Sequence, residues 1–232
     1  MNEIIMSYIF SSHYAIRSLE SIGSGRPVHL VDNSFNADLR IYAGRHPHID
    51  YIRPKIERFI DIDGDTNGST RMEWFPLTCA ESWNLAMERA QTQWVININP
   101  DMMCLPQTLQ LLDIAVEQRM DDVVLMRGVN GFNVWMGDRA WILENGGFDT
   151  RFKPCAGEDE DMLVRIGKSG KKWQRCGVAA YHQDGGHKDR VDVGARPGVT
   201  YCNSSVFKEK WGWIPNSPEY KKIVGAAHAG GL

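Results

Sequence analysis

The sequence contains no apolar run long enough to span a membrane and no extended basic cluster. Its 232 residues carry 26 Lys and Arg against 29 Asp and Glu, which gives a formal net charge of −3. A nearly balanced charge without a basic stripe argues against general nucleic-acid binding, because phosphate contacts need clustered cations. The first residues lack the charged segment and cleavage site of a signal peptide, so we expect a cytoplasmic protein.

The cysteines show no pattern of a metal site or a disulfide framework. The five cysteines are odd in number and widely spaced, and no Cys-x-x-Cys or Cys/His spacing typical of zinc sites occurs. Reduced thiols in a cytosol-like compartment are the simplest interpretation. Nucleophilic hydrolases are disfavoured as well, because the chain has no Gly-x-Ser-x-Gly motif.

Short apolar runs alternate with helical patterns through the first two-thirds of the chain, which is typical of an α/β fold with a mixed, mostly parallel sheet flanked by helices. The predicted strands cover residues 3–10, 27–31, 49–52, 94–98, 123–126, 132–136 and 178–182. The predicted helices cover residues 12–22, 139–144 and 158–166, and two more begin at a capping box at 78–81 and at 105–106.

From residue 183 onward the pattern changes. Residues 183–199 hold four glycines and several charges, so we expect a flexible loop there. A short helix is expected around 206–211, and a disordered tail at 228–232. The predicted organisation is therefore one Rossmann-like domain over residues 1–200, followed by a short C-terminal appendage over 201–232.

Acidic residues end two of the predicted strands. Asp101 follows the apolar run 94–98 through Asn99 and Pro100, and Asp32 ends the second strand. Ligands bind along this edge in open α/β sheets, where a carboxylate can hold a divalent cation or accept a hydrogen bond from a nucleoside. A turn or helix-capping role explains Asp101 about as well, and for Asp32 alone an Asx turn is the better explanation.

Four acids, from Glu158 to Asp161, begin the predicted helix at 158–166. The helix dipole stabilises carboxylates at this end, but it does not explain four in a row. Such a cluster indicates a cation site or a general base for a substrate hydroxyl. His182, at the end of the last predicted strand, is a candidate metal ligand only if it lies next to the presumed metal site.

Taken in order, these motifs resemble the GT-A glycosyltransferases, especially the inverting family that includes the bacterial rhamnosyltransferases. The resemblance covers residues 1–185 and is carried by Val31-Asp32-Asn33-Ser34, Ser82-Trp83-Asn84-Leu85-Ala86, Asn99-Pro100-Asp101, Gly146-Gly147-Phe148-Asp149, and Glu158-Asp159-Glu160-Asp161 with Arg165. The chain also resembles glycosyltransferase domains that build capsid glycans of chlorella viruses, which implies a host-cytoplasmic location. Two features depart from the family pattern: the first strand lacks a Pro-x-Tyr-Asn ending, and Asn99 replaces the first Asp of Asp-x-Asp.

The resemblance implies a GT-A (Rossmann-like) domain that moves a sugar from a nucleoside diphosphate donor, a UDP-rhamnose or UDP-hexose, to a hydroxyl of a glycan or glycoprotein. Inversion is favoured over retention. Asp101 and His182 would bind Mn²⁺ or Mg²⁺, and Asp159, with Glu158 beside it, would be the catalytic base. Asp32, Asn84, Asn99 and Asp101 would contact the nucleotide sugar.

Two alternatives stay open. A catalytically inactive module of the same fold would bind a glycan or nucleotide sugar without turnover. A sugar nucleotidyltransferase would also use acids and a metal, but it would carry a Gly-rich basic loop after the first strand. Residues 8–12 contain neither glycine nor a basic residue, so this alternative is the weaker one.

Overall fold

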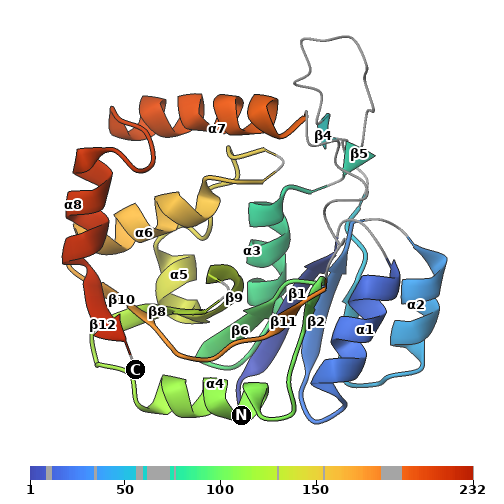
Figure 1. The fold of residues 1–232 in the computed structure, drawn as a ribbon. Helices are drawn as coiled ribbons and strands as arrows, with labels where there is room; N and C mark the ends of the chain where they lie inside the picture. The colour runs from blue at the N-terminus through green and yellow to red at the C-terminus, as the bar shows by residue number, and fades with distance from the viewer. Residues whose placement is uncertain are drawn as a thin grey trace.

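The computed structural model describes residues 1–8, 12–33, 36–55, 60–61, 74–75, 77–129, 131–153, 155–183 and 195–231. Helices cover both faces of an eight-stranded sheet (Figure 1), so the predicted α/β class is confirmed. The strand order is β12-β10-β8-β9-β6-β1-β2-β3, and β9 alone runs antiparallel to its two neighbours. The strands are β1 (Glu3–Tyr8), β2 (Val28–Asp32), β3 (Ile49–Ile52), β6 (Trp94–Ile98), β8 (Val123–Gly128), β9 (Gly131–Asp138), β10 (Lys172–Arg175) and β12 (His228–Gly231).

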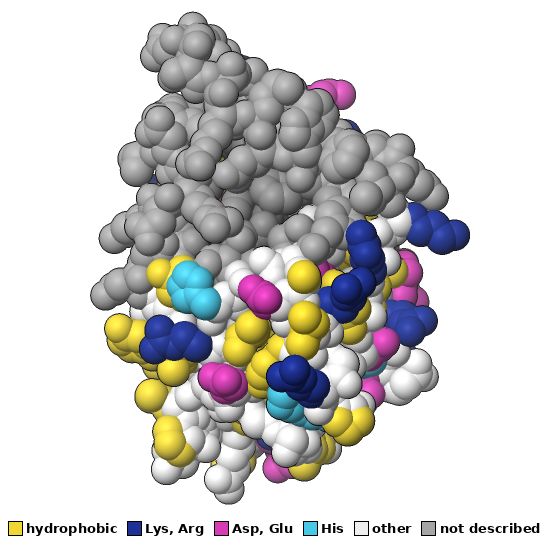
Figure 2. Space-filling model, turned by 90° about the vertical axis from the view of Figure 1, so that its right-hand side faces the viewer, with side chains coloured by type: hydrophobic (Ala, Val, Ile, Leu, Met, Phe, Trp, Pro, Cys, Tyr) yellow, Lys and Arg dark blue, Asp and Glu magenta, His cyan; other side chains and the backbone are white. Residues whose placement is uncertain are grey.

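Two short antiparallel pairs lie outside this sheet. One joins β7 (Met102–Met103) to β11 (Tyr181–His182), and the other joins β4 (Ile60–Asp61) to β5 (Trp74–Phe75). None of the helices in the described ranges has the length and apolar character that a membrane crossing requires. Figure 2 shows acidic and basic side chains interspersed over the described part of one face, in agreement with the balanced composition.

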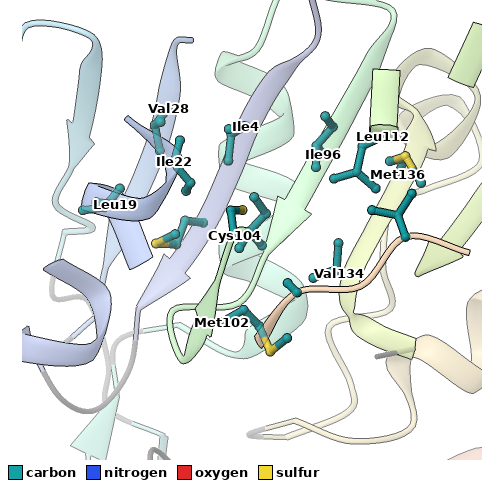
Figure 3. Close-up of a cluster of buried hydrophobic side chains, with 14 of the residues drawn as sticks. Ile4, Leu19, Ile22, Val28, Ile96, Met102, Cys104, Leu112, Val134 and Met136 are labelled. Carbon is teal, nitrogen blue, oxygen red and sulfur yellow. The ribbon is translucent and has the colours of Figure 1, made fainter. Parts of the chain in front are cut away.

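The sheet separates two hydrophobic cores, because successive strand residues point to opposite faces. Ile4, Ile96 and Met136 face the first core, part of which is drawn in Figure 3, whereas Ile5 and Val95 face the second. The first core is covered by α1 (Ser12–Ile22), α2 (Ala37–Gly44) and α4 (Thr108–Glu117). The second is covered by α3 (Cys79–Arg89), α5 (Arg139–Glu144), α6 (Glu158–Ser169), α7 (Ala195–Trp211) and α8 (Pro218–Ala226).

One predicted helix start is confirmed by its capping contacts, and one predicted helix end is wrong. The capping box of α3 is confirmed: Glu81 N donates to Thr78 Oγ1 at 3.0 Å, and Thr78 N donates to Glu81 Oε2 at 2.8 Å. The predicted end of α6 at Gly167 is wrong, because the helix continues to Ser169 and is capped by Gly170 in the left-handed conformation. Gly167 instead permits close packing, since a Cβ there would lie 2.7 Å from Ile223 Cγ2 of α8.

The last predicted strand needs correction. The sheet strand is β10 rather than 178–182, and only Tyr181 and His182 are extended, paired with β7. Trp173 is the one apolar residue of β10, so the segment lacks an apolar run.

The C-terminal predictions are also corrected. Residues 184–194 of the predicted loop lie outside the described ranges, but 195–199 form the first residues of α7, and the predicted boundary at 200 falls inside that helix. The predicted disordered tail is strand β12 over residues 228–231, paired with β10. This region is ordered by the second core, because Val224 O accepts from Trp173 Nε1 at 2.9 Å and Ala227 O accepts from Trp173 N at 3.0 Å.

Lys210 of α7 connects two distant acidic residues. Its ammonium lies 2.7 Å from Asp149 Oδ2 and 2.8 Å from Asp161 Oδ1. Trp211 Nε1 donates to Asp161 Oδ1 at 2.8 Å, and Arg165 Nε to Asp161 Oδ2 at 2.9 Å. Hydrogen bonds from Arg151 and Lys210 outweigh the effect of burial and hold the pKa of Asp149 well below its usual range. These contacts attach α7 to the Gly-Gly-Phe-Asp turn and to the first turn of α6.

We predict that Lys210→Met lowers the free energy of unfolding by about 2 kcal/mol or more, because it removes a shared cation from two largely buried carboxylates. Arg151 and Arg165 remain as partners, which keeps the loss below the ~3–5 kcal/mol of a fully orphaned charge. Urea denaturation measures the difference. Lys208→Met, at an exposed position of the same helix, is the control, and equal stability of the two variants would contradict the role of Lys210.

Candidate functional site

The site lies at the carboxyl edge of the parallel strands. Asp101 follows β6 at this edge, and the chain from β10 returns across it, with Gln183 N donating to Asp101 O at 2.8 Å. Pairing of β11 with β7 then sets His182 Nε2 3.2 Å from Asp101 Oδ2. The side chains are 13% and 42% exposed for Asp101 and His182, so a ligand can reach both. The structure thus brings the two predicted metal ligands together.

The described ranges contain no cluster of three or more His, Cys, Asp or Glu side chains suited to a metal. Among the described residues, Asp101 and His182 are thus the two that could hold a cation here, and a bound molecule or water could supply further ligands. A carboxylate oxygen with an imidazole nitrogen is a donor set that suits Mn²⁺ and related divalent ions.

Asp32 ends β2 at the same edge and is fully buried. Tyr51 of β3 donates its hydroxyl to Asp32 Oδ2 at 2.6 Å. Burial raises the pKa of Tyr51, and the hydrogen bond to Asp32 acts in the same direction, so the phenol stays protonated. The next residue, Asn33, donates to Ser82 Oγ at 2.8 Å and to Leu77 O at 3.1 Å, which fixes the end of β2 against the start of α3.

Three asparagines are hydrogen-bonded in a row at the strand end that precedes Asp101. Asn97 Nδ2 donates to Asn99 Oδ1 at 3.0 Å, and Asn99 Nδ2 donates to Asn133 Oδ1 of β9 at 3.0 Å. The two strands also join here through Asn99 N and Asn133 O at 2.9 Å. Asn99, predicted to contact the nucleotide sugar, uses both ends of its amide within the protein. Asn97 and Asn133 were not predicted, although an asparagine inside the apolar run 94–98 is a signal that could have identified Asn97.

Asn84, also predicted to contact the nucleotide sugar, binds the backbone of Phe148 with both ends of its amide. Its Nδ2 donates to Phe148 O at 2.9 Å, and its Oδ1 accepts from Phe148 N at 2.8 Å. Gly147 adopts a φ of +67°, and a Cβ at this position would lie 2.6 Å from Asn84 Oδ1. This geometry gives Asn84 the role of holding the Gly-Gly-Phe-Asp turn.

The four acids of α6 occupy different environments. Asp161 is fully buried and paired with Lys210 and Arg165. Burial and the nearby Asp159 charge raise the pKa of Glu158 to about 8, and burial with a hydrogen bond to Asp159 raises the pKa of Glu160 to about 9. Both glutamates therefore hold a proton at neutral pH. The negative charge of the four-acid cluster is thus smaller than its sequence indicates. Asp159, half-buried with Oδ1 accepting from Glu160 N at 3.0 Å, remains as the candidate base.

No family profile and no curated protein sequence matches this chain. Solved structures do match it. Residues 1–349 of S. aureus TarS in complex with UDP-GlcNAc give a TM-score of 0.60 at 13% identity, over 97% of this chain and 70% of that one. Glucosyl-3-phosphoglycerate synthase from Mycobacterium tuberculosis, in complex with Mn²⁺ and UDP-glucose, gives 0.62 at 9% identity, over 94% and 80%.

The chain has the GT-A fold. This confirms the predicted fold, while the rhamnosyltransferase-like and viral assignments stay predictions. The chain spans only 42% of a longer S. aureus TarS structure, with a TM-score of 0.54 at 15% identity. Within the GT-A fold, Asp101 follows β6, His182 ends β11 beside it, and Asp159 lies in the first turn of α6.

We predict that Glu158→Gln stabilises the protein at high pH. The folded carboxyl keeps its proton up to about pH 8, whereas an unfolded one loses it near its ordinary pKa of 4.5. Unfolding releases this proton between the two values, so stability falls as pH rises through that window. The variant should gain about 1 kcal/mol or more at pH 8 and nothing near pH 4.5.

Urea denaturation between pH 4.5 and 8.5 measures this difference, with Glu117→Gln at an exposed position of α4 as the control. Parallel stability curves for wild type and Glu158→Gln would show that Glu158 is ionised in the folded protein.

Proposed function

We propose that the protein transfers a sugar from a nucleoside diphosphate donor, a UDP-linked rhamnose or hexose, to a hydroxyl group of a glycan or glycoprotein. One observation carries the proposal: Asp101 and His182, 81 residues apart in the sequence, converge to 3.2 Å at the carboxyl edge of a GT-A sheet. Ligands of open α/β folds bind at this edge.

The solved neighbours support this choice of donor. The TarS fragment is bound to UDP-GlcNAc, and the M. tuberculosis synthase is bound to Mn²⁺ and UDP-glucose. In this chain, Asp101 and His182 would hold Mn²⁺ or Mg²⁺ together with diphosphate oxygens. A bound cation would offset the negative charge of the leaving diphosphate.

The remaining roles belong to the protein's own side chains. Asp32, oriented by Tyr51, would accept a hydrogen bond from the base or the ribose once a neighbouring group moves away from its buried carboxylate, and Asn99 would support the Asp101 turn beside it. Asp159 would remove the proton of the acceptor hydroxyl as that oxygen attacks the anomeric carbon, which favours inversion. Glu158 is protonated at neutral pH, so it would not act as the base.

A screen of nucleotide sugars for turnover, with and without Mn²⁺, tests the proposal directly. Turnover of a UDP-sugar supports transfer. Binding of UDP-sugars without turnover would favour the inactive binding module, and formation of a nucleotide sugar from a sugar phosphate would favour the nucleotidyltransferase. The cytoplasmic location and capsid-glycan acceptors remain predictions that this screen does not address.

We predict that Asp101→Ala abolishes the Mn²⁺-dependent part of UDP binding, because it removes the carboxylate that lies 3.2 Å from His182 Nε2. Calorimetric titration of UDP, with and without Mn²⁺, measures the effect. Asp121→Ala, at an exposed position before β8, is the control and should behave like wild type. Unchanged Mn²⁺-dependent affinity in Asp101→Ala would refute the metal assignment.

We further predict that Asp159→Asn lowers sugar transfer by at least ~10²-fold while UDP affinity stays within a few-fold, as expected for loss of a general base. Glu158→Gln is the matched comparison and should retain transfer, because Glu158 already carries a proton. If Asp159→Asn kept normal transfer and Glu158→Gln lost it, the base would be Glu158.

A further inference from the structure

Two arginines lie side by side at the carboxyl edge. Arg127 of β8 pairs directly with Arg175, the last residue of β10. Like charges opposite each other on neighbouring strands destabilise a sheet. Among the residues that the structure describes, neither guanidinium has a carboxylate within ion-pair distance. The pair therefore concentrates positive charge that no described side chain neutralises by direct contact.

Aromatic rings hold these guanidinium groups in place. Arg127 Cζ lies 4.4 Å from the centroid of the Trp173 ring and 5.3 Å from that of Phe132, and Arg175 Cζ lies 6.0 Å from the Trp173 ring. Stacking uses the faces of a guanidinium and leaves its N–H edges available for hydrogen bonds. Arg127 Nε is buried and has no hydrogen-bond partner among the described residues. An oxyanion would supply the missing acceptor.

The position of the pair relates it to the candidate site. β8 runs in the same direction as β6, because both are antiparallel to the intervening β9. Arg127 therefore lies at the same edge as Asp101, two strand spacings or about 10 Å along it. Burial lowers the pKa of Arg127, and the charge of the neighbouring Arg175 lowers it further. Tyr220, Asp159 and Glu160 act in the opposite direction. The charge of the candidate base Asp159 thus acts on Arg127.

We propose that Arg127 and Arg175 bind an anionic group, a phosphate or a carboxylate, carried by the acceptor. The assignment to the acceptor rests on the proposed function: the donor diphosphate would lie at Asp101 and His182, and the arginines lie beyond β9 beside Asp159. Two planar guanidinium groups match the oxygens of a phosphate or carboxylate, and charge-assisted hydrogen bonds of this kind are the strong ones.

Calorimetry of the whole chain tests the site with inorganic phosphate, glucose 6-phosphate and glucuronate as probes, the last two separating phosphate from carboxylate recognition. Arg127→Gln and Arg175→Gln should each weaken binding of the preferred probe by about tenfold or more, the loss expected for one charge-assisted hydrogen bond. Arg119→Gln is the matched control, because Arg119 also stacks on a tryptophan, with Cζ 4.8 Å from the Trp94 ring. Probe affinity in this control should equal that of wild type.

Thermal unfolding provides a second measurement that does not depend on one variant. Phosphate should raise the unfolding temperature of wild type and of Arg119→Gln by mass action, but not that of the double variant Arg127→Gln, Arg175→Gln. Arg127→Lys keeps the charge without the planar fork and should retain part of the effect. Wild-type protein that binds none of the three probes would overturn the proposal.

UDP titration with Mn²⁺ separates the acceptor assignment from the donor site. Unchanged UDP affinity in both glutamine variants supports an acceptor site, whereas a UDP loss as large as the phosphate loss would assign the arginines to the donor and overturn the inference. Protein that binds phosphate through the arginines but turns over no nucleotide sugar would refute the proposed transfer and leave the anion site standing.

Discussion

The placement of α6 depends on one shared cation. Lys210 lies between Asp149 and Asp161, so α7 is attached both to the Gly-Gly-Phe-Asp turn and to the first turn of α6. The amide of Asn84 holds the same turn through the backbone of Phe148. With these contacts in place, Asp159 is presented at the carboxyl edge by a helix start that cannot shift without separating buried charges. Asp149 and Asp161, the aspartates of the two motifs, thus have a structural role. The neighbouring Asp159 carries the chemistry that we propose.

The fold could be predicted wherever a strand is a mostly apolar run or a helix has a capping signal. Residues 94–98 are apolar except for Asn97, and Thr78 with Glu81 forms a capping box, so both elements were found. β10 was missed because Trp173 is its one apolar residue, and its order depends on α8 and β12 packing against it. Contacts of this kind are tertiary and leave no local periodicity.

The site was predictable as a set of residues but not as a set of roles. Strand ends identify Asp32 and Asp101. The sequence does not show, however, that the side-chain amide of Asn99 is hydrogen-bonded to Asn97 and Asn133. Ionisation is equally hidden, since burial decides that Glu158 holds a proton.

Charge at the carboxyl edge is distributed more evenly than four consecutive acids indicate. Glu158 and Glu160 are protonated at neutral pH, and Asp161 is paired with Lys210 and Arg165, which leaves Asp159 as the acid of this cluster that is available to a ligand. Only the strand order brings Arg127 and Arg175 together at this edge, and neither has a carboxylate within ion-pair distance among the described residues. The edge therefore offers a cation site at Asp101 and His182 and an anion site two strand spacings along it. A donor held through its diphosphate at the first and an acceptor held through an oxyanion at the second would meet between them, next to Asp159.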